Sequence, residues 1–178
     1  MILLYAISQI EISPWMVRVK TSRMSNGGSC GGSIIASKYV LTAAHCVEGA
    51  EYAWIELGGF YSGDTKYGLS VTRIIIHPGF QFPENNLALF ETSSPIDLII
   101  YTPVCLRKTT RTFDWKMAEV LVYRDGTQKI YRCLILPPGH CLGEIKTEDS
   151  VLCITQLGGL KPVRFILHWK KDAYFFVG

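Results

Sequence analysis

Apolar and polar residues alternate along this chain in short runs, which is the pattern of β-strands with one buried face. Gly, Pro, Asn and Asp separate the runs, and no amphipathic helical pattern exceeds two turns; residues 43–46 form at most one helical turn. The sequence therefore predicts an all-β barrel or sandwich. Strands are predicted at 15–20, 33–36, 39–42, 52–57, 69–76, 87–90, 120–123, 130–136, 163–169 and 174–177.

Composition narrows the class of protein. The chain has 178 residues, 48% of them hydrophobic, which suffices for one domain or for two small barrels packed together. Its net charge is +3 and its Lys and Arg residues are scattered, so nucleic acid and membrane surfaces are not expected partners. No apolar run reaches the roughly 18 residues of a membrane span. Residues 1–7 are apolar but lack a preceding positive charge and a cleavage site, so no complete signal peptide is expected.

The six cysteines stand at positions 30, 46, 105, 133, 141 and 153. None belongs to a CxxC pair and no histidine pair has metal-ligand spacing, so neither a metal nor a cofactor is expected. An even number of cysteines without that spacing favours disulfides and an oxidising compartment. The alternative is a set of reduced, buried cysteines in a cytosolic protein.

The most specific motif is SCGGSII at 29–35, followed by VLTAAHC at 40–46. This motif resembles the histidine motif of the trypsin/chymotrypsin-like serine proteases. In that arrangement two strands bring Cys30 and Cys46 together, and a disulfide fixes the turn that carries His45. A general base needs such a fixed backbone to stay within reach of its nucleophile. The alternative is a structural histidine beside a structural disulfide.

The resemblance extends over nearly the whole chain. It implies a single peptidase domain over 1–178 with the trypsin-like double β-barrel fold: a first barrel at 1–101, a link at 102–112 and a partial second barrel at 113–178. The second barrel is expected to be incomplete, because in the family it continues beyond the strand that matches 171–178. The other matching segments are 14–17, 77–80, 103–106, 113–120, 141–143 and 153–159, and Ile2 aligns with the isoleucine of the family's activation site.

The resemblance also shows substitutions at the catalytic positions. The segment NNLAL at 85–89 places Asn86 where the family has the triad aspartate, and in a well-studied member that change lowers turnover about 10⁴-fold. The segment CITQLGGL at 153–160 places Leu157 at the nucleophilic serine. The same register puts Gln156 at the preceding aspartate and Thr155 at the oxyanion-hole glycine. Only the triad histidine, His45, is retained.

The resemblance further implies which cysteines pair. Cys30 is expected to bond to Cys46, and Cys133 to Cys141 by analogy with a bridge of the second barrel. The family partners of Cys105 and Cys153 have no counterpart in this sequence. These two cysteines are therefore expected to be free or paired in another way.

Three functions remain open at this point. The first is a secreted, catalytically inactive protease homologue that binds a protein or peptide partner. The second is a serine endopeptidase acting in proteolysis, as the family resemblance alone implies. The third is a truncated gene product that has no stable fold.

Overall fold

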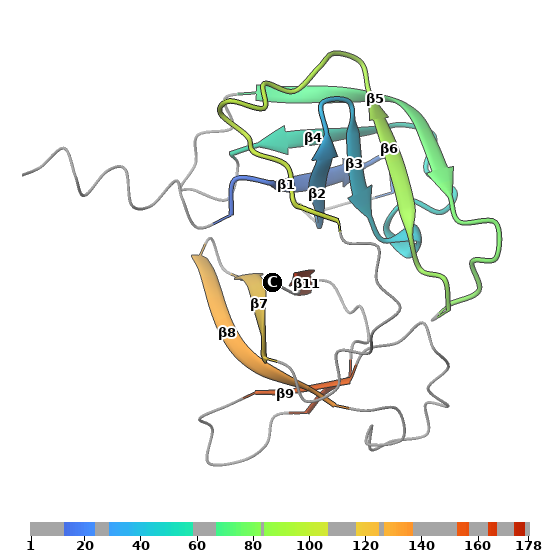
Figure 1. The fold of residues 1–178 in the computed structure, drawn as a ribbon. Helices are drawn as coiled ribbons and strands as arrows, with labels where there is room; N and C mark the ends of the chain where they lie inside the picture. The colour runs from blue at the N-terminus through green and yellow to red at the C-terminus, as the bar shows by residue number, and fades with distance from the viewer. Residues whose placement is uncertain are drawn as a thin grey trace, which may run out of the picture. The chain divides into compact units, whose positions relative to one another are not determined.

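The computed structural model describes residues 13–23, 29–58, 67–82, 84–106, 117–124, 127–136, 153–156, 164–166 and 173–176. Two compact units emerge (Figure 1). The first comprises Met1–Ile76 and Leu87–Arg107, and the second comprises His77–Asn86 and Lys108–Gly178. Within the described residues, no helix is long and apolar enough to cross a membrane.

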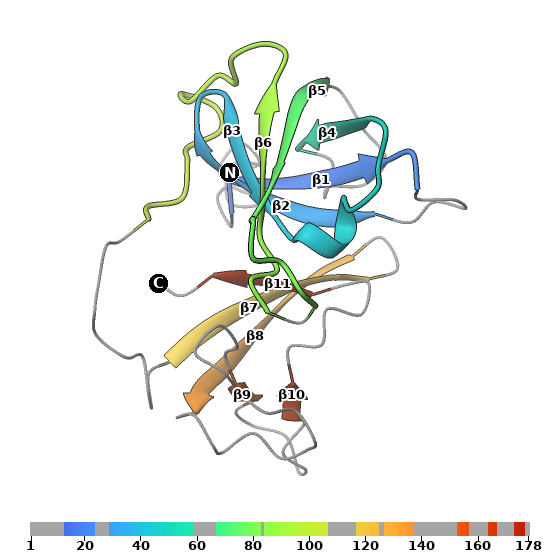
Figure 2. The same ribbon diagram turned by 90° about the vertical axis from the view of Figure 1, so that its right-hand side faces the viewer.

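The first unit contains a closed barrel with the strand order β1-β2-β3-β6-β5-β4, and β4 pairs back onto β1 (Figures 1 and 2). All neighbouring strands run antiparallel. The closing pair joins Val17 to Leu57 and Thr21 to Ala53, so each barrel strand has a neighbour on both sides. The strands are β1 (Met16–Thr21), β2 (Cys30–Ala36), β3 (Tyr39–Thr42), β4 (Ala53–Leu57), β5 (Tyr67–Ile76) and β6 (Ala88–Thr92).

The barrel core follows from the alternation in the sequence. Strands β4 and β6 show the same pattern, in which every second residue is buried. Full burial of an aliphatic or aromatic side chain stabilises the fold by about 1.5–3 kcal/mol, so this set of residues supplies much of the driving force for closure. The largest fully buried apolar side chains of the barrel strands are Val17, Val19, Ile34, Val40, Ile55 and Phe90.

The second unit contains a five-stranded antiparallel sheet with the order β10-β9-β8-β7-β11. Its centre is a long hairpin, in register from the Met117–Leu134 pair to the Arg124–Thr127 pair. Cys133 and Ile135 are buried on β8. The strands are β7 (Met117–Arg124), β8 (Thr127–Leu136), β9 (Cys153–Gln156), β10 (Arg164–Ile166) and β11 (Ala173–Phe176).

The prediction of an all-β fold with a complete first barrel is confirmed, and the described strands of the second unit form an open sheet. The single helical turn expected at 43–46 is the 3-10 helix η1 (Ala44–Cys46). Strand β9 was not predicted as a strand. Its four residues are too few to establish a period of two, so the sequence identifies them only as part of the segment 153–160.

Candidate active-site region around His45

His45 lies on η1, directly after strand β3. Ala43 keeps an extended backbone (φ −87°, ψ 138°), and the chain then turns, with the Val47 amide donating to the Ala44 carbonyl at 3.0 Å. Ala44 and Val47 are buried and anchor the turn on either side of the half-buried His45. The end of β3 is held by the Thr42 hydroxyl, which donates to the Gly31 carbonyl at 2.7 Å. The imidazole is therefore carried on a well-anchored backbone.

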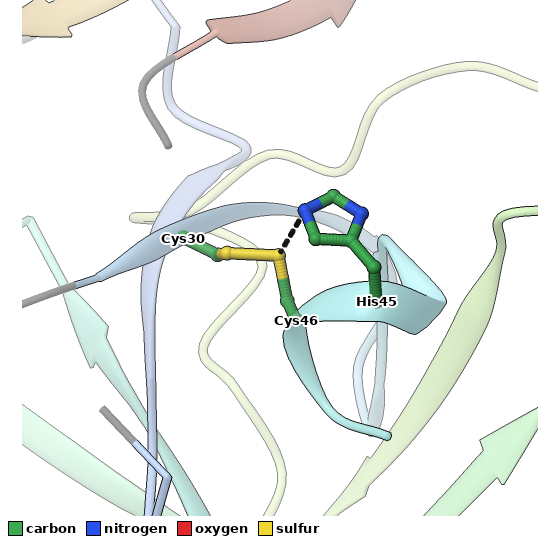
Figure 3. A group of neighbouring side chains, drawn as sticks. All are labelled: Cys30, His45 and Cys46. Atoms are coloured by element: carbon green, nitrogen blue, oxygen red, sulfur yellow. Dashed lines mark hydrogen bonds between the residues drawn. A yellow bond between two sulfur atoms is a disulfide. The ribbon is translucent and has the colours of Figure 1, made fainter. Parts of the chain in front are cut away.

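A disulfide joins Cys30, at the start of β2, to Cys46 on η1, with Cα atoms 6.3 Å apart. Figure 3 shows the imidazole of His45 turned toward this bridge, with Nε2 3.3 Å from the Sγ of Cys46. The predicted Cys30–Cys46 bond is therefore present. The contact between His45 and a bridge sulfur was not foreseen, because sequence spacing says nothing about the rotamer of the imidazole.

The His45 nitrogen and the two sulfurs lie within 4.8 Å of one another, which is also a spacing that metal ligands adopt. Soft metals, however, bind the deprotonated thiolate form of cysteine. Both sulfurs here share a disulfide and carry no thiolate charge. In this oxidised state the arrangement favours a fixed imidazole over a metal centre.

Asn86 is buried at the end of the segment 77–86, which belongs to the second compact unit, whereas His45 belongs to the first. Hydrogen bonds hold the turn around Gly79 and Asn85 in the described part of this segment. The Gly79 amide donates to Nδ1 of His77 at 3.1 Å, and the Asn85 side-chain amide donates to the Gly79 carbonyl at 3.0 Å. Asn85 has a φ of 50°, a left-handed conformation that asparagine tolerates better than most residues. Asn86 thus follows a turn whose shape depends on its neighbour.

Thr155 and Gln156 lie in strand β9. Thr155 stands opposite Leu134 of β8 and also opposite Arg164 of β10, so β9 is flanked on both sides at this position. Leu157, the residue aligned with the nucleophile, lies outside the described residues. The assignment of Leu157 to the nucleophile position therefore stays a prediction.

The remaining cysteines differ in their surroundings. Cys105 is exposed and has no disulfide partner among the described residues. Cys133 is buried, and burial raises the pKa of its thiol, which keeps the reduced side chain protonated and poorly reactive. Its expected partner, Cys141, lies outside the described residues, so that pairing stays a prediction.

The profile of the trypsin family matches residues 6–159. The chain belongs to the trypsin family. It is 35% identical over 141 residues to serine protease filzig of Drosophila melanogaster, covering 70% of this chain and 8% of filzig. It is 30% identical over 150 residues to mouse tryptase, covering 79% of this chain and 54% of tryptase. The chain thus spans about half of tryptase and a small part of filzig.

Solved structures show the same fold. A structure described as HL collagenase superposes with a TM-score of 0.70 at 22% identity, covering 80% of this chain and 68% of the other. The scabies mite inactivated protease paralogue S-D1 superposes with a TM-score of 0.68 at 21% identity, covering 79% and 69%. These likenesses support the trypsin-like architecture of this family member.

Proposed function

We propose that this member of the trypsin family is a non-catalytic homologue that binds a protein or peptide partner without cleaving it. The observation that carries the proposal is Leu157. The family match runs to residue 159 and so covers the segment 153–159, in which the sequence resemblance assigns Leu157 to the position of the nucleophilic serine. A leucine side chain has no atom that can attack a carbonyl, so the covalent step of the family's mechanism has no nucleophile.

Two further substitutions support the same conclusion. Asn86 at the aspartate position is neutral, so it would not stabilise the imidazolium that forms when His45 takes a proton. Thr155 at the oxyanion-hole position is a strand residue with a neighbour on each side. Amides in such a strand point at the adjacent strands, whereas an oxyanion donor must point into the substrate cleft.

A serine endopeptidase remains the second candidate, and the placement of His45 favours it. The imidazole is held beside a disulfide on an anchored turn, as a general base requires. The curated relatives also include proteins named serine protease and tryptase. The third possibility, a product without a stable fold, is disfavoured for the first unit by its closed barrel with fully buried side chains.

The partner and the compartment are proposed by class. Proteases recognise peptide segments, so a homologue that keeps the fold but loses the nucleophile is expected to retain a protein or peptide as its ligand. The Cys30–Cys46 disulfide supports an oxidising, extracellular compartment. Phenoloxidase-activating factor 3 of Holotrichia diomphalia, 29% identical over 195 residues, is one relative whose name places it in an activation process.

The proposal predicts that a fluorophosphonate probe, which labels activated serines, leaves the purified protein unlabelled. Mouse tryptase, labelled in parallel, is the positive control. Casein peptides incubated with the protein should keep their masses, as read by mass spectrometry. Labelling of the unmodified protein, or cleavage of casein peptides by it, would refute the proposal that the chain is inactive and would support the serine endopeptidase.

A serine introduced by Leu157→Ser should also remain unlabelled, because Asn86 and Thr155 still stand at the other catalytic positions. The matched comparison is the quadruple variant Leu157→Ser, Gln156→Asp, Thr155→Gly and Asn86→Asp. Labelling of this variant alone would support the register assigned to the segment 153–160. If the single variant Leu157→Ser is labelled, Asn86 and Thr155 do not contribute to the loss of reactivity toward the probe.

A further inference from the structure

The two sulfurs of the Cys30–Cys46 bridge have different surroundings. Cys30 is half-buried at the start of β2, where solvent reaches the residue. Cys46 is 8% exposed and lies on η1 between the half-buried His45 and the buried Val47. The Sγ of Cys46 lies 3.3 Å from Nε2 of His45 (Figure 3). Cys30 is therefore the more exposed residue of the bridge, and Cys46 is the one with a short sulfur–imidazole contact.

We propose that this bridge is redox-active and undergoes thiol–disulfide exchange with small thiols of the glutathione class, with His45 assisting. The thiolate of the reagent attacks Sγ of Cys30 and forms a mixed disulfide, while the bond electrons leave with Sγ of Cys46 as a thiolate. The thiolate of a second reagent molecule then attacks the reagent-derived sulfur of that mixed disulfide. This step releases Cys30 as a thiolate and the reagent as its own disulfide, so two electrons pass to the protein.

The asymmetry sets the direction of the first step. Exchange is faster when the attacked sulfur is accessible and when the leaving thiol has a low pKa. A cysteine next to a histidine cation has its thiolate stabilised, and an N–H bond at Nε2 can donate to the departing sulfur. Accessibility favours attack at Cys30, and His45 favours departure of Cys46. Both observations favour the same direction of cleavage, with attack at Sγ of Cys30 and departure of Sγ of Cys46.

Opening the bridge would also change the environment of His45. In the oxidised chain the bridge links η1 covalently to β2. After reduction η1 would be held by its backbone hydrogen bonds and by the burial of Ala44 and Val47. The position of the imidazole would then depend on the redox state of the surroundings, whether or not the chain has peptidase activity.

The test follows reduction of the native protein by glutathione. Samples are quenched with acid, free thiols are capped with N-ethylmaleimide, and peptides are mapped by mass spectrometry. The early adduct should carry glutathione on Cys30 and the maleimide on Cys46. His45→Ala should slow the reduction about three- to tenfold, because the leaving thiolate loses its stabilising neighbour. His77→Ala, which removes an exposed histidine elsewhere, is the matched control and should react at the wild-type rate.

Rescue separates an electrostatic role from a structural one. His45→Lys restores a cation without an imidazole and should recover part of the rate, and His45→Ala should weaken the preference for the Cys30 adduct. Three results would overturn the proposal: a bridge that glutathione does not open in the folded protein, a glutathione adduct mainly on Cys46, or an unchanged rate in His45→Ala. The adduct position is read on the wild-type chain, so it decides the matter even if a variant fails to fold.

Discussion

Gly32 illustrates how a single residue of the histidine motif sets the packing of the barrel. A Cβ added at Gly32 would lie 2.8 Å from Cγ1 of Val40 and 3.1 Å from the carbonyl oxygen of Leu41. Gly32→Ala should therefore lower the free energy of unfolding by about 1–3 kcal/mol, the usual cost of overpacking a core. Urea denaturation measures the change. Gly68→Ala is the matched control, because its Cβ would meet only the Ile55 carbonyl at 3.8 Å, and an equal loss in both variants would contradict the steric explanation.

Individual residues were predicted unevenly from the sequence. Cys30, Cys46 and His45 were foreseen because their spacing in a specific motif defines a known local geometry. The 3.3 Å approach of Nε2 to the Cys46 sulfur was not foreseen, since it depends on side-chain rotation. The hydrogen bonding of the turn that precedes Asn86 was also not foreseen. It rests on a side-chain hydrogen bond from Asn85 to Gly79, six residues earlier, which no hydrophobic pattern records.

At the level of elements, the Cys30–Cys46 bridge ties β2 to η1 across a sequence separation of 16 residues. A closed loop of about 15 residues is worth about 3 kcal/mol in the chain-entropy account of disulfides. The double variant Cys30→Ser and Cys46→Ser should lower the unfolding free energy by roughly 2–4 kcal/mol in denaturant titrations. Cys105→Ser, at an exposed thiol, should change it by less than about 0.5 kcal/mol. Equal effects would mean that the bridge does not stabilise the barrel.

The strands themselves were largely predictable. The runs around β1, β3 and β4 alternate cleanly because one face of each strand enters the barrel core. β2 begins at Cys30, three residues earlier than expected, because Gly31 and Gly32 weaken the apolar signal although both are buried strand residues. Short strands flanked by uninformative sequence, such as β9, lack enough residues to show any period.

At the scale of the whole molecule, closure of the first barrel depends on pairs that no local pattern encodes. β1 pairs with β4, and β3 pairs with β6, across long stretches of intervening chain. The family resemblance supplied this topology, whereas alternation alone left a barrel and a sandwich equally possible. The segment His77–Asn86 groups with the second compact unit although its neighbours in sequence belong to the first, an association set by tertiary packing rather than by sequence order.

The two sheets should differ in how easily they open, because one is closed and the other has edges. Every strand from β1 to β6 has a neighbour on both sides, whereas β10 and β11 each pair on one side within the described residues. Amides of edge strands exchange through small local openings, but barrel amides require larger ones. Hydrogen-exchange mass spectrometry should therefore show slower exchange in peptides from β1, β4 and β5 than in peptides from β10 and β11.

Strand β8 is the internal control, because β7 and β9 flank it within the second sheet. Protection of β8 together with fast exchange in β10 and β11 would mean that edges, not a lack of folding, cause the difference. Uniformly fast exchange across β7, β8 and β9 would show that the second unit has no cooperative structure. That result would favour the hypothesis of a truncated gene product without a stable fold for this half of the chain. Equal protection in β10 and in the barrel strands would contradict the open-sheet topology, since it would require a further neighbour for β10.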